Sequence, residues 1–279
     1  MIQAELRGKL PEIENKEDIL TSNIFGMLKY LPPQKGIFRI LEAAKDYSER
    51  RNSFIENLKT QNIDLNNYDD VDYLFWEYSP VHGEPDIVVI IRSSKGRQTD
   101  LMLCIEVKFL SGKSGIGEYD QLKAYTLGLA DKEKRKTFSN TKISKFGGTF
   151  IGTIYLTHFS QFRSVVDSLK EIRKSGASGF ESKIYELRWN DITKALVRFN
   201  SENEYENLLA NDLVLLLKKK NFVDFLGFPE VSFNVRYNNL FHPPLKKEVS
   251  TKPIFNGFRD IASIDIFKFD TNIFLRRER

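Results

Sequence analysis

Cysteine, histidine and long apolar segments are scarce in this sequence, and each shortage excludes a class of protein. Cys104 is the only cysteine, so no disulfide can form within the chain, which favours a reducing compartment such as the cytoplasm. The three histidines lie far apart, and no Cys/His spacing typical of zinc sites occurs. No apolar stretch reaches the length of a membrane span and the first residues carry no apolar signal region, so no membrane association is expected.

What the sequence does contain is typical of a globular protein. Hydrophobic residues make up 41% and charged residues 29% of the chain, which is ordinary for a folded domain. A length of 279 residues allows one core with an extension, or two small domains. The net charge of +4 is mild, so the composition permits nucleic-acid binding without requiring it.

Apolar periodicity and turn residues predict an alternating order of helices and strands. The predicted helices cover residues 15–31, 36–59, 118–130, 162–175, 191–198 and 204–220. The predicted strands cover residues 74–78, 86–92, 100–110, 149–156 and 183–189, and short strands are expected near 231–237 and 261–268. Residues 62–73 are expected to form a loop, and 131–145 a loop or a frayed helix end. This order predicts an α/β (α+β mixed) fold, in which helices flank both faces of a mixed central β-sheet.

Charged residues occur within two neighbouring apolar runs, where their burial is unfavourable unless another group compensates for it. Pro85-Asp86 directly precedes the first run, and Glu106-Val107-Lys108 lies near the end of the second. The turn between the runs, residues 93–97, is short enough for an antiparallel hairpin. Because side chains alternate along a strand, Glu106 and Lys108 point to the same face, and pairing of the two strands brings Asp86 opposite them.

This arrangement predicts a metal-dependent hydrolytic site. Carboxylate oxygens from Asp86 and Glu106 suit Mg²⁺ (or Mn²⁺), and the Val107 carbonyl offers a third oxygen. Such a cation polarises a phosphate and lowers the pKa of a bound water. Lys108 is expected to orient or deprotonate that water, with a lowered pKa, or to neutralise the phosphate. The alternative is a surface ion pair beside a turn. Either motif alone favours this alternative, whereas the two motifs together on adjacent apolar strands favour the metal site.

The residues Pro85-Asp86 and Glu106-Val107-Lys108 resemble the PD-(D/E)xK nuclease superfamily, which has the restriction-endonuclease-like fold. Residues 120–125 are similar to the helix that follows the Glu-x-Lys strand, which implies that Gln121 supports the site. An ordinary solvated helix residue is an equal alternative for it. Residues 17–26 resemble a first helix whose acid reaches the metal or its water. Glu17 is the choice here and Asp18 the second, and a purely helix-stabilising acid is the alternative.

The resemblance covers, in patches, residues 12–32 and 74–228, which defines a nuclease-like domain at 1–229 and a C-terminal extension of unknown role at 230–279. It implies a Mg²⁺-dependent endonuclease that acts on DNA, with RNA not excluded, in a prokaryotic antiviral defence setting. A homodimer or a partner protein in a defence complex is a further expectation. The alternatives are a nucleic-acid-binding module that keeps the fold without cutting, and a structural subunit of a larger complex.

A nuclease must also hold a polyanion, for which Lys and Arg are the usual contacts. Glycines in residues 112–117 allow backbone amides to approach a phosphate. Clusters of basic residues are further candidates, although each alone is more typical of a solvated surface. They are Lys132, Lys134, Arg135, Lys136, Lys142, Lys145, Arg173, Lys174, Lys218, Lys219, Lys220, Arg276 and Arg277.

Overall fold

The structure describes part of the chain. A computed structural model describes residues 6–7, 17–94, 96, 98–109, 120–177 and 179–223. All of them belong to one unit, Met1–Gly227. The predicted strands at 231–237 and 261–268, the extension 230–279 and the glycine-rich residues 112–117 lie outside the described residues. None of the described helices is both long and apolar enough to span a bilayer.

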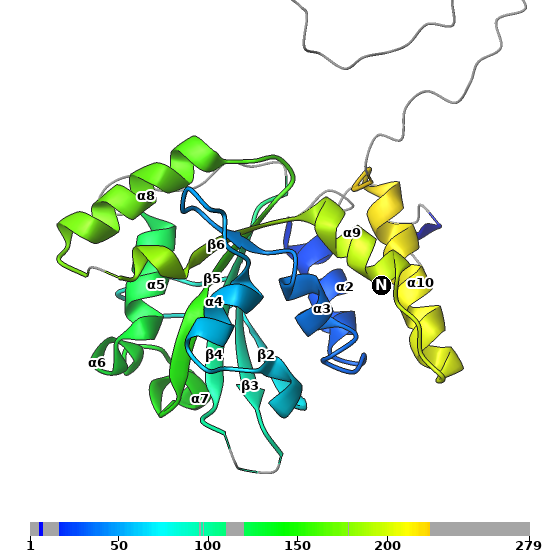
Figure 1. The fold of residues 1–279 in the computed structure, drawn as a ribbon, viewed down its shortest axis with the longest axis horizontal. Helices are drawn as coiled ribbons and strands as arrows, with labels where there is room; N and C mark the ends of the chain where they lie inside the picture. The colour runs from blue at the N-terminus through cyan, green and yellow to red at the C-terminus, as the bar shows by residue number, and fades with distance from the viewer. Residues whose placement is uncertain are drawn as a thin grey trace, which may run out of the picture. The chain divides into compact units, whose positions relative to one another are not determined.

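A six-stranded mixed sheet forms the centre of the described unit, with the strand order β1-β6-β5-β4-β3-β2 (Figure 1). The strands are β1 (Lys45–Asp46), β2 (Asp70–Phe75), β3 (Ile87–Arg92), β4 (Leu101–Val107), β5 (Thr149–Thr157) and β6 (Ile184–Arg188). Strands β4, β5 and β6 run parallel, whereas β3 is antiparallel to β4 and the two edge strands are antiparallel to their neighbours. The predicted mixed α/β architecture is therefore confirmed.

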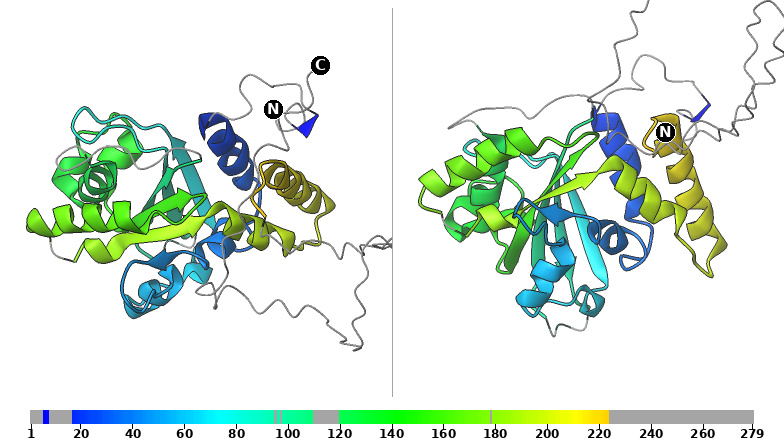
Figure 2. Two further views of the ribbon diagram at one scale, coloured as in Figure 1. Left: turned by 90° about the horizontal axis from the view of Figure 1, so that it is seen from above. Right: turned by 45° about the horizontal axis from the view of Figure 1, so that its top comes forward.

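Helices cover both faces of this sheet (Figures 1 and 2). On one side lie α2 (Glu17–Leu28), α3 (Ile37–Leu41), α9 (Trp189–Val197) and α10 (Glu204–Lys219). On the other side lie α5 (Gln121–Ala130), α6 (Lys132–Arg135), α7 (Thr141–Ser144) and α8 (Phe162–Lys174). The described residues also form α4 (Phe54–Thr60) and the 3-10 helices η1 (Leu65–Asn67) and η3 (Glu181–Lys183).

The apolar core follows the alternation of side chains along the strands. Ile105 and Val107 of β4 pack in the larger cluster, together with residues of α2, α9 and α10. Cys104 of the same strand faces the opposite way and packs with Tyr125 and Leu129 of α5. Because Glu106 alternates with Ile105 and Val107, its side chain shares the α5 face of the sheet with Cys104.

The hairpin that carries the candidate site forms as predicted, since β3 pairs with β4 from Ile87↔Ile105 to Ile91↔Leu101. The helix α5 begins beside it because the Asp120 side chain accepts a hydrogen bond from the Lys123 amide. Ser168 Oγ of α8 also donates to Asp120, at 2.8 Å. One buried carboxylate therefore fixes the start of α5 and joins α5 to α8.

The helix predicted over residues 36–59 is wrong. The structure contains α3, the edge strand β1 and α4 in this segment. Asp46 explains the interruption, because its carboxylate accepts hydrogen bonds from the Ser48 amide and hydroxyl and from the side chain of Asn57. Such local side-chain hydrogen bonds compete with the helical backbone pattern. The capping box of Ser53 and Glu56 then starts α4 as a separate helix.

The loop predicted over residues 62–73 is also wrong in its last part, which belongs to β2. Asp70 and Asp72 are poor strand formers, so the sequence does not show this strand. Its pairing along the whole of β3 overrides that preference, and Arg92 of β3 forms ion pairs with both aspartates. The charged segment 131–145 contains the short helices α6 and α7, which are capped by Asp131 and Asn140.

Candidate active site

Two carboxylates meet where β3 begins and β4 ends. Asp86 directly precedes β3, and the pairing of Ile87 with Ile105 places it opposite Glu106. The Val107 amide donates a hydrogen bond to Asp86 Oδ2 at 2.7 Å. The backbone of Asp86 is held as well, because its carbonyl accepts from the Trp76 amide at 3.1 Å. The hairpin thus brings together the two carboxylates that the sequence pattern predicted as neighbours.

An ammonium group completes this cluster. Lys108 Nζ lies 2.8 Å from Glu106 Oε1 and 3.4 Å from Glu17 Oε1. The Lys108 backbone is fixed on both sides, since its amide donates to the Leu156 carbonyl at 2.7 Å and its carbonyl accepts from Trp189 Nε1 at 3.1 Å. The lysine side chain is only 8% exposed. Its position is therefore determined by packing and hydrogen bonds rather than by solvent.

Glu17 comes to the cluster from a distant part of the sequence. It is the first residue of α2, and its second carboxylate oxygen accepts from the Phe109 amide at 2.8 Å. Glu17 therefore holds both the side chain of Lys108 and the backbone that follows it. Asp18, the second choice from the sequence, is exposed.

Gln121 reaches the cluster through a tyrosine. Gln121 Nε2 donates to the Tyr125 hydroxyl at 3.3 Å, and that hydroxyl donates to the Glu84 carbonyl at 3.1 Å. Burial raises the Tyr125 pKa, and the charges of Glu106 and Asp86 raise it further, so the ring lies beside both carboxylates. The sequence interpretation missed Tyr125 as a site residue, although its i,i+4 spacing from Gln121 on α5 was a usable signal.

Burial dominates the electrostatics of the carboxylate pair. Burial and the charge of Asp86, opposed by Lys108, raise the pKa of Glu106 to about 8. Burial likewise raises the pKa of Asp86, against the hydrogen bond from the Val107 amide. The two carboxyl groups are hydrogen-bonding neighbours, so without another cation they share a proton around neutral pH.

Lys108 remains a cation in this environment. Burial disfavours its charge, but Glu106, Glu17 and Asp86 together raise the Lys108 pKa above its ordinary value. The lowered Lys108 pKa expected beside a bound metal stays a prediction. Lys108 is suited to attract an anion and is poorly suited to accept a proton from water.

The residues present fit a divalent cation with few protein ligands. Glu106 Oε2 is buried and has no hydrogen-bond partner among the described residues. Since the N–H of Val107 faces Asp86, its carbonyl faces the same side of the extended strand. No group of three or more His, Cys, Asp or Glu side chains among the described residues is arranged to hold a metal. Mg²⁺ usually keeps several waters and takes one or two carboxylates, which matches this donor set.

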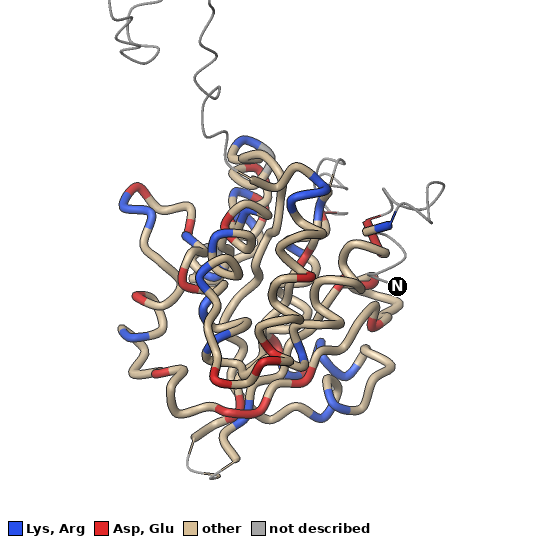
Figure 3. Tube along the Cα trace, turned by 90° about the vertical axis from the view of Figure 1, so that its right-hand side faces the viewer, with Lys and Arg blue, Asp and Glu red and all other residues tan. Residues whose placement is uncertain are grey.

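The basic residues proposed as phosphate contacts are partly engaged elsewhere. Arg135 is buried and donates to the Phe146 carbonyl. Lys136 pairs with Glu133, and Lys142 pairs with Asp72. Figure 3 shows acidic and basic residues interspersed along the described chain. Three of the six basic residues named in the segment 131–145 are therefore engaged within the protein.

Comparison of the chain with protein-family models, with curated proteins and with solved structures gives no match in any of the three. The functional argument therefore depends on the fold and on the geometry of this cluster.

Proposed function

We propose that the protein is a metal-dependent endonuclease of the PD-(D/E)xK type that hydrolyses phosphodiester bonds in DNA. The supporting observation is the convergence of Asp86, Glu106 and the Lys108 ammonium at one end of the β3–β4 hairpin. A buried acid pair that retains a proton, with one oxygen lacking a partner among the described residues, is a receptor for a cation. The adjacent ammonium is a receptor for a phosphate.

The roles of the residues follow from their contacts. Asp86, Glu106 and the Val107 carbonyl would hold Mg²⁺ or Mn²⁺, which supplies Lewis-acid polarisation of the phosphate and a more acidic water when bound. Lys108 stabilises the negative charge that develops on the phosphate in the transition state. Glu17 keeps the Lys108 side chain in place through its contact with Nζ at 3.4 Å.

Tyr125 and Gln121 act as positioning residues. The Tyr125 hydroxyl holds the carbonyl of Glu84, two residues before Asp86, and Gln121 holds that hydroxyl. These contacts fix the approach of the chain to Asp86. A catalytic carboxylate must be held within a fraction of an ångström, so such support contributes to rate even without contact to substrate.

Plasmid cleavage by the full chain tests this proposal. Wild-type protein with Mg²⁺ should cut supercoiled DNA, and a chelator should abolish cutting. Asp86→Asn and Lys108→Met should each lower the rate at least about 100-fold, because even residues that only support a metal ligand contribute 10–100-fold. Asp167→Asn and Lys170→Met, which change the same residue types on exposed surfaces, should cut like wild type.

One observation favours a second candidate, a binding or structural subunit that keeps the fold. Glu106 is 2% exposed, and Lys108 already lies between two carboxylates, as in a purely structural ion-pair cluster. This candidate predicts no cleavage of DNA or RNA with any divalent metal. It also predicts that Mg²⁺ and Mn²⁺ leave the thermal stability unchanged.

A further inference from the structure

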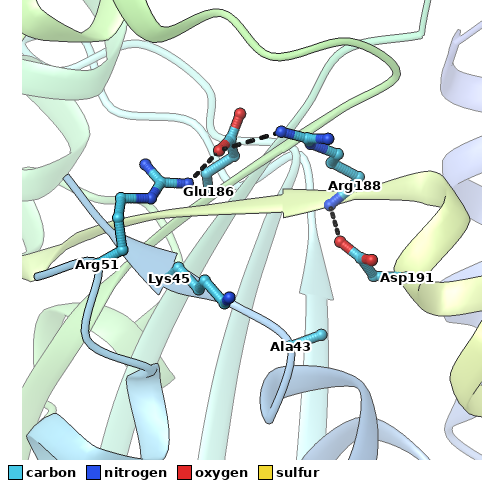
Figure 4. Close-up of a pocket in the computed structure, with 6 residues that line it drawn as sticks. All are labelled: Ala43, Lys45, Arg51, Glu186, Arg188 and Asp191. Carbon is cyan, nitrogen blue, oxygen red and sulfur yellow. Dashed lines mark hydrogen bonds and ion pairs between the residues drawn. The ribbon is translucent and has the colours of Figure 1, made fainter. Parts of the chain in front are cut away.

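A second polar site lies at the β1 edge of the sheet, beside β1 and β6 (Figure 4). It is a cavity of about 450 Å³, within the size range of small-ligand pockets. Its lining combines three cationic and two anionic side chains, which leaves an excess of one positive charge. The lining residues are Ala43, Lys45, Arg51, Glu186, Arg188 and Asp191.

Glu186 organises the cations of this pocket. Its side chain is 3% exposed and forms an ion pair with Arg51, while Arg188 Nη2 lies 3.8 Å from the same oxygen, Oε2. Figure 4 shows the carboxylate between the two guanidinium groups. The other oxygen, Oε1, is buried and has no hydrogen-bond partner among the described residues. The pocket therefore offers two oriented guanidinium groups and one unused acceptor.

The loop after β1 is built to hold Arg51 in place. Arg51 has a φ of 52°, a left-handed conformation that is strained for a residue with a side chain. Its amide donates to the Ser48 carbonyl at 3.1 Å, and its guanidinium lies 5.2 Å from the centre of the Tyr47 ring. The buried Asp46 carboxylate supports the same loop through the Ser48 amide. Strain of this kind persists only where the surrounding contacts impose it.

The pocket lies in register with the candidate active site. Glu106 pairs with Tyr155, and Tyr155 pairs with Glu186, so the three side chains form one row on the same face of the parallel strands. Two strand spacings separate the ends of this row, which is roughly 10 Å. Each strand of a DNA duplex rises about 3.4 Å per nucleotide along the helix axis, so this distance corresponds to about three nucleotides.

From these observations we infer that the pocket binds a backbone phosphate of the same nucleic-acid strand that enters the candidate active site, about three nucleotides from the scissile linkage. This inference rests on the proposed function. Arg51 and Arg188 present the planar donors that bind phosphate oxygens, and Lys45 adds charge. Glu186 Oε1 accepts a hydrogen bond from a base amino group of that nucleotide.

Oligonucleotide binding with a charge-matched control tests the inference. Fluorescence anisotropy of a labelled single-stranded 16-mer, with a chelator present, compares wild type with Lys45→Gln/Arg188→Gln. This variant keeps the Arg51 partner of Glu186, so the buried carboxylate stays paired. The control Lys35→Gln/Lys170→Gln removes the same charge from exposed positions outside the pocket. Thermal melting verifies that both variants are folded.

The expected result is about tenfold weaker binding by the pocket variant. Losing the one phosphate contact in the pocket should also reduce the slope of log affinity against log salt by roughly 0.7, because each neutralised phosphate contributes about 0.7 on single strands. The control should bind like wild type with an unchanged slope. An equal loss in both variants, or no loss in the pocket variant, overturns the inference. The inference is also overturned if inorganic phosphate stabilises the protein through Arg188 while the pocket variant binds the oligonucleotide like wild type.

Cleavage kinetics separate this inference from the proposed function. If both are right, the pocket variant has a raised KM and an unchanged kcat, whereas Asp86→Asn binds the oligonucleotide and does not cut. If cleavage requires Asp86 but the pocket variant binds the oligonucleotide like wild type, the phosphate pocket is refuted and the nuclease proposal stands. If oligonucleotide binding requires the pocket but wild type does not cut, the nuclease proposal is refuted and the phosphate pocket stands. No oligonucleotide binding by wild type refutes both.

Discussion

Replacing Glu106 with glutamine tests the candidate site most directly, because the change removes a charge and keeps the shape of the side chain. Burial, together with Asp86, raises the Glu106 pKa from 4.5 to about 8 in the folded protein. A carboxyl group of this kind stabilises the fold while it is protonated, and that contribution is lost as the pH rises through the folded pKa. In a chelator, wild-type stability should therefore decrease between pH 4.5 and about 8, and the variant should lack this decrease.

The magnitude follows from the two pKa values. The difference between 4.5 and about 8 corresponds to roughly 5 kcal/mol at 1.36 kcal/mol per pKa unit. This is an upper bound, since Asp86 and Lys108 titrate together with Glu106. We expect Glu106→Gln to exceed wild type by about 3 kcal/mol at pH 9 and to match it within about 1 kcal/mol at pH 5.

Other ionisable groups around Glu106 do not produce the same slope. Burial raises the pKa values of Cys104, Tyr125 and Tyr155 from ordinary values that already lie at 9.0 or above. These groups are therefore neutral between pH 4.5 and 8. Burial also raises the pKa of Asp86, so the difference between wild type and variant reports Glu106 together with its coupling to Asp86.

Urea unfolding at pH 5, 7 and 9 in a chelator measures the effect. Fluorescence is a suitable signal, because the buried Trp189 ring is hydrogen-bonded to the Lys108 carbonyl. Glu133→Gln, an exposed carboxylate, is the control and should leave the pH profile unchanged. A Glu106→Gln protein that is less stable than wild type at pH 9, or that keeps the wild-type slope, would refute the assignment of a buried protonated acid.

Three further predictions concern the ligands and their supports. Mn²⁺ at 100 times its Kd should stabilise wild type by about 2.7 kcal/mol in thermal melting and leave the stability of Asp86→Asn unchanged. Equal stabilisation of the two proteins would mean that the metal binds elsewhere. Tyr125→Phe removes the hydrogen bond to the Glu84 carbonyl and should lower cleavage about tenfold with an unchanged melting temperature, whereas Tyr185→Phe should cut like wild type. Asp120→Ala removes the cap of α5 and the bond from Ser168, so it should destabilise the fold by about 1–3 kcal/mol in urea unfolding, with Asp131→Ala as a milder control.

The sequence predicts the hairpin and its acid pair because both depend on short-range rules. Alternation places Glu106 and Lys108 on one face, and a short turn forces the antiparallel pairing that brings Asp86 opposite Glu106. Glu17 is different, since no local pattern connects it with a lysine 91 residues later. Only the family resemblance indicated it, and its contact depends on how α2 packs against the sheet.

The second pocket could not be predicted, because its parts join segments far apart in the sequence. Arg51 and Glu186 are 135 residues apart. The loop that holds Arg51 lies inside a segment whose apolar spacing predicted one continuous helix, residues 36–59. Asp46 breaks that helix through hydrogen bonds whose strength depends on its burial, and burial is a property of the folded sheet. Sequence periodicity carries no information of this kind.

The two sites contain the same local pattern, an acid, an apolar residue and a cation at the end of a parallel strand. Glu106 and Val107 end β4 and Lys108 follows directly, whereas Glu186-Leu187-Arg188 ends β6. Their different chemistry comes from the adjacent antiparallel strand.

In register, Asp86 lies opposite Glu106, whereas Lys45 lies opposite Glu186. A second carboxylate beside the first produces an acid pair that attracts a cation, and a lysine beside it produces a net positive pocket that attracts a phosphate. The pairing partner, rather than the motif, therefore decides which ligand each strand end can take. A search for sites in this fold must examine cross-strand neighbours as well as sequence motifs.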